Sequence, residues 1–207
     1  MKYQKINTLW KRDDEGKIMQ GEYSDPVFQN IKEWTVTEKV DGTNIRVYWW
    51  GTTPTISFEG RTDNAQIPPH LVEKLKQLFT GKKMKEVFGE TRAVLYGEGY
   101  GYKIQKGYHK KEASFILFDV LVDAWWLERK NVVDIAQKLD IDVVPQLEYT
   151  TVEECVKFVQ GVGDTFSSLD PQTQIEGIVA TPNPLVLSRA GVPVKFKLKC
   201  KDYEENE

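Results

Sequence analysis

The segment "TEKVDGTNIRVYWW", residues 37–50, predicts two β-strands joined at an Asp-Gly pair. Apolar and polar residues alternate before the pair, and apolar residues fall on one face after it, as in half-buried strands. Because Asp-Gly is a turn signal, we expect the two strands to form a rigid, hairpin-like unit that turns at Asp41-Gly42. Lys39 then places a charged, flexible amine at the end of a strand that heads for the interior.

The rest of the chain mixes strand-like and helical patterns in an irregular order. Helices are expected at 70–79, 131–140 and 151–160, with a further turn or so of helix at 81–89, and further strands at 51–60, 93–101, 114–122, 176–182 and 192–200. Residues 1–33 are polar with scattered apolar positions, and we expect loops there. This order predicts an α+β fold with antiparallel sheets flanked by helices. Since no repeat or low-complexity linker marks a boundary, we expect one domain over 1–207.

Composition excludes several classes of protein. A formal net charge of −3 gives the chain no polycationic field for non-specific nucleic-acid binding, so such contacts must come from a local patch. Cys155 and Cys200 form no CxxC pair, which gives no support to a zinc site or a disulfide framework. The N-terminus lacks the apolar run of a signal peptide, and no segment resembles a membrane span. We therefore expect a cytoplasmic protein, acting in a host cytoplasm if a phage or virus encodes it.

Lys39 allows two interpretations. A lone lysine beside a turn commonly extends its amine into solvent. A nucleophilic lysine needs a lowered pKa, because a free amine with a pKa of about 10.4 is neutral in only about one molecule in two thousand at pH 7. Burial and neighbouring cations lower such a pKa. If Lys39 is a nucleophile, other basic groups should therefore converge on it.

Suitable basic residues recur near the C-terminus. In "VPVKFKLKC", residues 192–200, Lys195, Lys197 and Lys199 appear at period 2, so a strand would point all three to one face and its apolar residues to the other. A solvent-facing strand has the same pattern. Arg61, directly after a predicted strand, is a further candidate, and its alternative is a solvated loop arginine.

Two carboxylates lie among strand-like apolar residues. Glu98 in "LYGEGYG" and Glu176 in "QIEGIVA" are each followed at once by Gly, which permits close approach of another group to the backbone. Buried acids are rare without a partner or a metal. Each could equally be a carboxylate at a strand end or a turn.

Six segments occur in one order over residues 38–199: "EKVDGTN", "GRTDNAQIP", "LYGEGYGY", "SFILFDV", "EGIVATP" and "VKFKLKC". Together they resemble the successive motifs of the covalent lysine nucleotidyltransferases, the superfamily of ATP-dependent ligases and mRNA capping enzymes. "EKVDGTN" and the following "GRT" are most similar to the RNA ligase 2-type RNA ligases. The resemblance implies the ATP-grasp-like nucleotidyltransferase (adenylation) domain of DNA and RNA ligases, and an ATP-dependent RNA ligase activity.

The resemblance also implies a role for each matching residue. Lys39 would attack the α-phosphorus of ATP, expel pyrophosphate and hold AMP through a phosphoramide bond. The implied binding contacts are Glu38 beside the adenine pocket, Asn44 and Arg61 near the phosphate and the incoming strand end, Glu98 on the ribose, Phe118 stacked on adenine, and Lys197 and Lys199 on the α-phosphate. Lys195, in the same register, is an alternative to either of the last two.

The implied cofactors are ATP and a divalent metal. Glu176 matches the acid that orients a hydrated metal, and Mg²⁺, or Mn²⁺ in its place, suits this role because Mg²⁺ keeps most of its waters and takes few carboxylates. The implied partners are RNA ends or a nicked duplex. Basic clusters at 81–85 and 102–111, the second interleaved with Tyr, are candidates for gripping phosphates, or else solvated loops.

The sequence departs from the family pattern at two places. The chain ends soon after Lys199, so we expect no OB-fold or other C-terminal domain, and either a minimal ligase, a catalytic domain with a separate partner, or a piece of a longer chain. Asp41 stands where some RNA ligase 2 relatives have His, and Asp also occurs in DNA ligases and capping enzymes. A minimal DNA ligase, a nucleic-acid-binding module without sealing activity and a capping-type guanylyltransferase therefore stay open as alternatives. The oligomeric state stays open too.

Overall fold

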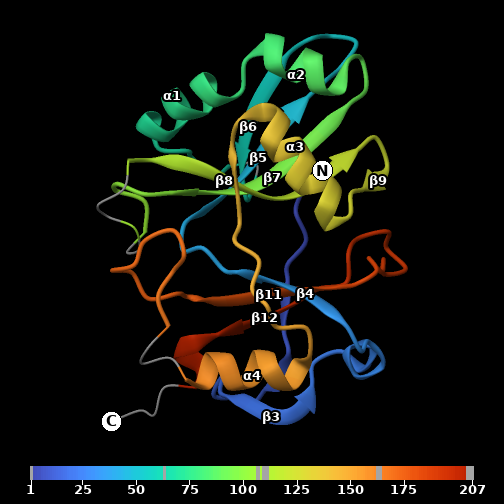
Figure 1. Cartoon of the computed structure of the whole chain (residues 1–207), viewed down its shortest axis with the longest axis vertical. Helices are drawn as coiled ribbons and strands as arrows, with labels where there is room; N and C mark the ends of the chain where they lie inside the picture. The colour runs from blue at the N-terminus through green and yellow to red at the C-terminus, as the bar shows by residue number, and fades with distance from the viewer. Residues whose placement is uncertain (1, 63, 106–107, 109–111, 162–164, 204–207) are drawn as a thin grey trace. The chain divides into compact units, whose positions relative to one another are not determined.

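The computed structural model describes residues 2–203 except 63, 106–107, 109–111 and 162–164 (Figure 1). The chain divides into two compact units. Unit 1 consists of Met1–Tyr3 and Asp41–Val144, and unit 2 consists of Gln4–Val40 and Pro145–Glu207. None of the helices in the described part of the chain has the length and apolar character that a membrane span requires.

Unit 1 is built on a sheet with the strand order β10-β8-β7-β5-β6, and β9 pairs with β8. Its strands are β5 (Thr43–Trp49), β6 (Ile56–Gly60), β7 (Ala93–Tyr100), β8 (Ser114–Val122), β9 (Trp125–Trp126) and β10 (Asp142–Val143). The pairs are antiparallel except for β10 with β8, which is parallel. The strands expected at 51–60 and 93–101 are confirmed with shorter bounds, and the strand expected at 114–122 is confirmed with the same bounds.

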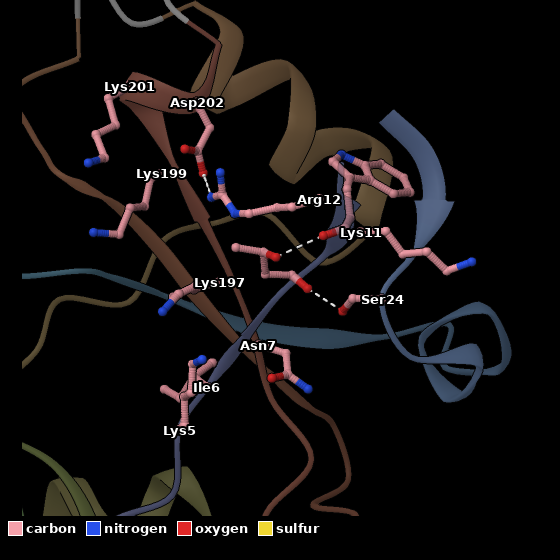
Figure 2. Close-up of a pocket in the computed structure, with 12 residues that line it drawn as sticks. Lys5, Ile6, Asn7, Lys11, Arg12, Ser24, Lys197, Lys199, Lys201 and Asp202 are labelled. Atoms are coloured by element: carbon pink, nitrogen blue, oxygen red, sulfur yellow. Dashed lines mark hydrogen bonds and ion pairs between the residues drawn. The ribbon is translucent and has the colours of Figure 1, made fainter. Parts of the chain in front are cut away.

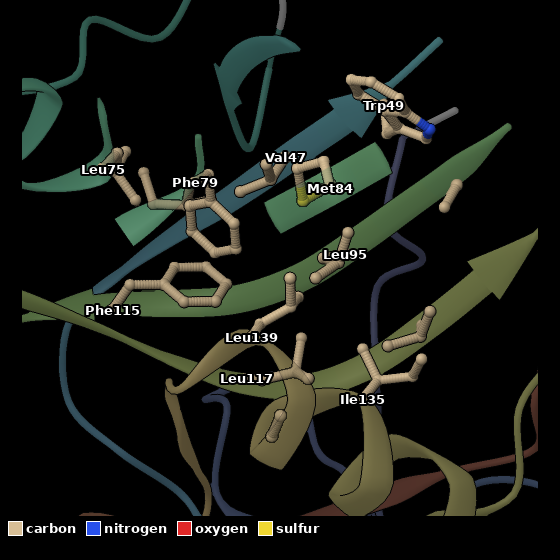
Figure 3. Packing of buried hydrophobic residues seen from close by; sticks show 14 of the residues in the cluster. Val47, Trp49, Leu75, Phe79, Met84, Leu95, Phe115, Leu117, Ile135 and Leu139 are labelled. Atoms are coloured by element: carbon tan, nitrogen blue, oxygen red, sulfur yellow. The ribbon is translucent and has the colours of Figure 1, made fainter. Parts of the chain in front are cut away.

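Helices α1 (Pro69–Leu78), α2 (Gly81–Phe88) and α3 (Arg129–Leu139) contribute their apolar sides to the core of unit 1. The alternating residues of β5, which include Val47, pack against them from the sheet. Figure 3 shows the rings of Phe79 and Phe115 meeting in this core, with centroids 5.2 Å apart and planes nearly perpendicular. The amphipathic patterns at 70–79 and 131–140 therefore predicted α1 and α3 correctly, whereas the turn or so expected at 81–89 is the longer helix α2.

A β-bulge interrupts the pairing of β7 with β8 at Phe118. Tyr96 pairs with Asp119 and Gly97 pairs with Leu117, so Phe118 is an extra residue between the two pairs. A bulge of this kind re-aims a side chain. Leu117 lies in the core beneath the helices, whereas Phe118 joins a separate cluster that contains Tyr96.

Unit 2 is built on a second sheet, in the order β1-β12-β11-β4. Its strands are β1 (Asn7–Thr8), β12 (Phe196–Lys199), β11 (Gly177–Pro182) and β4 (Trp34–Glu38). β11 pairs antiparallel with both β12 and β4, and β1 pairs parallel with β12. The other elements are the pair β2 (Trp10–Arg12) and β3 (Ile18–Tyr23), helix α4 (Val152–Gln160), and the 3-10 helices η1 (Pro26–Asn30) and η3 (Cys200–Asp202).

Aromatic and aliphatic side chains form the core of unit 2. The rings of Trp34 and Phe196 lie 4.6 Å apart, centroid to centroid, and α4 packs its buried side chains into the same cluster. A capping box, in which Thr151 and Glu154 satisfy each other's backbone donors, begins α4. In the described part of the chain, Cys155 and Cys200 are buried and not joined in a disulfide, and burial raises the pKa of Cys155 to about 12, so this thiol stays protonated at neutral pH.

The expected hairpin across Asp41-Gly42 is wrong. β4 pairs with β11 in unit 2, whereas β5 pairs with β6 and β7 in unit 1. Asp41-Gly42 instead carries the chain from one unit into the other. Glycine is needed because a Cβ at Gly42 would lie 2.2 Å from the carbonyl oxygen of Gly99.

The expectation of loops over residues 1–33 is also wrong. This segment forms β1, β2, β3 and η1. β1 and β2 span only two and three residues, and β3 is mostly exposed, so none of them shows an alternating apolar pattern. Pairing with β12, which lies far away in sequence, fixes β1 as a strand.

A cavity in the core of unit 1 should lower the free energy of unfolding. Leu117→Ala removes a fully buried side chain and should lower the free energy of unfolding by about 3 kcal/mol. Urea unfolding followed by tryptophan fluorescence measures this change. Gln77→Ala, at an exposed position of α1, is the matched control and should change stability by less than about 0.5 kcal/mol. Equal losses in the two variants would contradict this packing.

Candidate active site

Lys39 directly follows β4 in unit 2. Its backbone N–H donates a hydrogen bond of 2.9 Å to the carbonyl oxygen of Gly177, so the end of β4 is fixed to the start of β11. Its Nζ donates to a carboxylate oxygen of Glu176. The side chain is largely buried, with 24% of its surface exposed. Lys39 is therefore held in place, unlike a lysine that extends freely into solvent.

Glu176 also binds Lys199. The Nζ of Lys199 donates to the second carboxylate oxygen of Glu176 over 2.6 Å. The ladder explains this meeting, because Gly177, next to Glu176, pairs with Lys199 across β11 and β12. The structure thus brings together Lys39, Glu176 and Lys199, which are far apart in sequence.

The two lysines keep Glu176 ionised. Burial by itself raises the pKa of the Glu176 carboxyl, but Lys39 and Lys199 outweigh burial and hold that pKa below its usual range. An ionised carboxylate in a half-buried position is a suitable oxygen ligand for Mg²⁺ or Mn²⁺. Among the described residues, no group of three or more His, Cys, Asp and Glu side chains is placed to hold a metal ion. A metal held by Glu176 would therefore take its other ligands from water and phosphate oxygens.

Gly177 allows the strands to meet at Glu176. A Cβ at this position would lie 2.0 Å from the carbonyl oxygen of Leu198, and its φ of +152° is one that side chains disfavour. At Gly99, which follows Glu98, a Cβ would lie 2.4 Å from Cδ2 of Leu71. The expectation that each glycine after an acid permits close approach is confirmed.

The lysines of β12 follow the predicted alternation. Phe196 and Leu198 are buried in the core, and Lys197 and Lys199 are half-buried on the other face of the strand. Lys195 precedes β12, and its Nζ donates to the hydroxyl of Thr181 over 2.8 Å. Lys199 is therefore the β12 lysine that contacts Glu176, and it shares with Lys197 a pocket of about 520 Å³ (Figure 2).

Glu38, also in unit 2, is almost fully buried at the end of β4. Its carboxylate accepts a hydrogen bond from the hydroxyl of Ser167 and another, of 3.2 Å, from the backbone N–H of Ser168. Its side chain shares the strand face of Val36, which points into the core. The role beside adenine stays a prediction.

Asn44 and Glu98 lie directly opposite each other in unit 1, on β5 and β7. Cross-strand partners of this kind share one face of a sheet. The Oδ1 of Asn44 is buried and accepts no hydrogen bond from the described residues. A buried acceptor without a donor is costly, so this atom is a candidate contact for a ligand hydroxyl or amine.

Phe118 is half-buried in unit 1 beside Tyr3, with ring centroids 5.0 Å apart and an edge-to-face contact. Tyr3 donates a hydrogen bond to Asp119, and burial together with this carboxylate raises the pKa of Tyr3 well above its usual value. Phe118 is thus packed at its edge by a neutral tyrosine. Arg61 is exposed directly after β6.

Sequence reasoning missed Arg46. Its guanidinium is 1% exposed, and it donates to the carbonyl oxygen of Gly60 over 2.9 Å and pairs with Glu59 at 3.1 Å. Arg46 therefore fixes the backbone immediately before Arg61. Its place between Ile45 and Val47, which face the helices, was the available signal, because alternation puts it on the opposite face.

The structure describes the two predicted basic clusters to different extents. Residues 81–85 form the first part of α2, where Met84 is buried and Lys82 and Lys85 are exposed. Most of the lysines of the cluster at 102–111, together with His109, lie outside the described residues. Lys103 is described, and its Nζ lies 5.1 Å from the ring centroid of Tyr102, a cation–π contact.

The comparison with known families gives a match over most of the chain. A model described as RNA ligase matches residues 32–199. This range includes each of the candidate site residues discussed so far, from Glu38 to Lys199. A search of curated protein sequences gives no match.

Solved structures show the same fold. An RNA ligase of Naegleria gruberi, as a mutant with ATP and Mn, aligns with a TM-score of 0.64 at 19% identity, over 97% of this chain and 62% of that chain. Another mutant of that ligase, with AMP and Mn, aligns at 0.65 and 18%, over 96% and 58%. An archaeal ATP-dependent RNA ligase aligns at 0.64 and 16%, over 98% and 49%. The expected ligase nucleotidyltransferase fold is thus confirmed, and the chain spans less than two thirds of these proteins.

The pKa of Glu176 makes stability depend on pH. Because this pKa is lower in the folded state, the stabilisation from the carboxylate is complete above the unfolded pKa of about 4.3 and is lost as the pH falls through the folded value. Glu176→Gln should therefore cost about 1 kcal/mol at pH 7 and progressively less below pH 4. Urea midpoints across this pH range test it, with Glu153→Gln on the exposed side of α4 as the control. A cost independent of pH would contradict the assignment.

Proposed function

Because this chain belongs to the RNA ligase family, we propose that it is an ATP-dependent RNA ligase that works through a covalent lysyl-AMP intermediate. The observation that carries the proposal is the cluster in which Glu176 binds both Lys39 and Lys199. It supplies a held amine, a second cation for the phosphate and a carboxylate for a metal. We propose that residues 1–207 together form the nucleotidyltransferase domain.

In the first step, the neutral amine of Lys39 attacks the α-phosphorus of ATP. A bond forms between Nζ and phosphorus, the bond from phosphorus to the bridging oxygen of the β-phosphate breaks, and pyrophosphate leaves with that electron pair. The nitrogen gives up two protons to solvent, one before the attack and one after the bond to phosphorus has formed, and its Nζ starts from a hydrogen bond to Glu176. Lys199 and Lys197 would stabilise the negative charge that grows on the phosphate oxygens.

A divalent metal held by Glu176 would add positive charge beside the same phosphate. A metal held by Glu176 would share this carboxylate with Lys39, whose Nζ donates a hydrogen bond to it. The Naegleria ligase structures with ATP and Mn and with AMP and Mn support ATP and a divalent metal as the cofactors.

Residues of unit 1 would bind the nucleoside. The unsatisfied Oδ1 of Asn44 and the neighbouring Glu98 would accept hydrogen bonds from ribose hydroxyls, and Phe118 would stack on adenine. Two further steps complete sealing. AMP passes from Lys39 to a 5′-phosphate end, and a 3′-hydroxyl then attacks that phosphate and releases AMP, with Arg61 as a candidate contact for the strand end.

Covalent labelling tests the first step. With α-labelled ATP and Mg²⁺, the denatured chain should retain label, and Lys39→Ala and Lys39→Arg should both abolish it. Lys39→Arg keeps the positive charge opposite Glu176, but an arginine does not lose its proton, so it separates loss of the nucleophile from loss of the fold. Lys17→Ala, at an exposed lysine, should label normally. Label that persists in both Lys39 variants would exclude Lys39 as the nucleophile.

Nicked duplexes then test the substrate. An RNA 3′-hydroxyl at the nick should be sealed at least about tenfold faster than a DNA 3′-hydroxyl. Preference for DNA would favour the alternative of a minimal DNA ligase. Labelling without sealing of either duplex would point to a catalytic domain that needs a partner.

Asn44→Ala tests the nucleoside contact. Loss of one hydrogen bond should raise the ATP concentration for half-maximal labelling about tenfold, which corresponds to ~1.4 kcal/mol. Thermal stability should stay the same or rise, because the variant removes a buried acceptor that has no donor in the described residues. A fall in stability with unchanged dependence on ATP would instead indicate a structural role. Gln77→Ala is again the control.

A further inference from the structure

Tyr102, two residues beyond the end of β7, exposes an aromatic ring on unit 1. Its exposed fraction is 54%, although Tyr100 before it and Ile104 after it are buried. The backbone N–H of Ile104 donates a hydrogen bond of 3.0 Å to the carbonyl oxygen of Gly101, which closes a tight turn around the tyrosine. A fixed turn therefore presents this ring to solvent.

Two further features concern the backbone of this turn. The Nε2 of His70, in the first turn of α1, donates a hydrogen bond of 3.0 Å to the carbonyl oxygen of Tyr102, because a carbonyl oxygen can only accept. Lys103 has a φ of +57°, in the left-handed region that glycine adopts more readily than any residue with a side chain. Glycine at this position would therefore suit the backbone better, which points to a role for the lysine side chain.

Tyr102 and Lys103 together present a ring and a cation. The Nζ of Lys103 lies 5.1 Å from the centroid of the Tyr102 ring. Within the part of the chain that the structure describes, Lys103 forms no ion pair with a carboxylate. Aromatic rings stack on nucleobases of any kind, and a neighbouring lysine attracts phosphate. The pair therefore has the chemistry that recognises an unpaired strand of RNA.

The turn lies close to the proposed nucleoside contacts of unit 1. Leu71, next to His70 in α1, packs over Gly99, where a Cβ would lie 2.4 Å from Cδ2 of Leu71. Gly99 follows Glu98, so the start of α1 contacts both the backbone beside this acid and the turn at Tyr102. At about 3.4 Å per residue, the four residues from Glu98 to Tyr102 span at most about 14 Å. Since stacked nucleotides rise about 3.4 Å each, this distance corresponds to about four nucleotides.

We propose that Tyr102 stacks on an unpaired nucleobase of the RNA substrate, within about four nucleotides of the ends to be joined, and that Lys103 binds an adjacent phosphate. This inference rests on the proposed function, and it adds a contact for the RNA strand. Stacking tolerates every base, because each base has a π face. The contact would therefore select RNA ends with open bases and would not select a sequence.

Fluorescence anisotropy tests the stacking contact without requiring catalysis. A 5′-phosphorylated single-stranded RNA is titrated with the full chain in the absence of ATP. Tyr102→Ala and Tyr102→Leu should each raise the Kd about tenfold, ~1.4 kcal/mol, whereas Tyr102→Phe keeps the ring and should change it less than about twofold. Trp125→Ala is the matched control, because it removes a ring on β9 that is 77% exposed, and it should leave the Kd unchanged.

A fully paired RNA duplex distinguishes stacking from general attraction to RNA. Its bases are covered by their neighbours, so Tyr102→Ala should change the Kd for this duplex less than about twofold. Equal losses of affinity for the paired and the unpaired RNA would exclude stacking on an open base.

Lys103→Gly tests the cation without straining the turn, since glycine adopts a positive φ readily. Loss of one phosphate contact should reduce the slope of log Kd against log salt concentration by about 0.7, and thermal stability should stay the same or rise. Lys17→Ala, at an exposed lysine, should leave the slope unchanged. An unchanged slope in Lys103→Gly would exclude this lysine as a phosphate contact.

Failure of this inference and failure of the proposed function give different results. An unchanged Kd for single-stranded RNA in Tyr102→Ala, or no binding of this RNA by the parent protein, excludes the stacking contact. Failure of the parent protein to label with ATP would refute the proposed ligase chemistry. The RNA titrations would still decide the role of Tyr102, since they need no covalent step.

Discussion

Glu176 holds its carboxylate between the ammonium groups of Lys39 and Lys199, and three strands must be in register for these side chains to meet. A slip of one residue in β12 would turn Lys199 into the core and Leu198 out of it. The packing of Phe196 against Trp34 on the far face opposes such a slip. The hydrophobic core of unit 2 therefore fixes the strand register, and this register brings the charged side chains together on the opposite face of the sheet.

Local patterns predicted the residues of this cluster but not the pairing that assembles it. Period 2 in "VPVKFKLKC" placed Lys197 and Lys199 on one face, which the structure confirms. The turn signal at Asp41-Gly42 suggested that β4 pairs with its neighbour in sequence. Its actual partner is β11, about 140 residues later, and pairing between such distant segments leaves no local signal.

The direction in which side chains point was the second property that the sequence pattern did not predict. In "SFILFDV" the four residues "FILF" are all apolar, so alternation could not reveal that a bulge separates Leu117 from the position where Phe118 leaves the helix-covered core. Likewise, Asn44 looks like an ordinary polar strand residue, and only the surrounding structure shows that its oxygen is buried without a donor. Motif order identified both residues, whereas hydrophobic pattern would have identified neither.

Unit 2 is discontinuous in sequence, because Asp41–Val144 lies between its two segments. During synthesis, β1 and β4 leave the ribosome long before β11 and β12, the strands that pair with them, so the unit 2 sheet cannot close until the segment after Val144 has been made. Unit 1 is almost continuous and can fold in the interval, which shortens the flexible loop that unit 2 must close. Lys39 is thus made early, but the carboxylate that holds it is made 137 residues later.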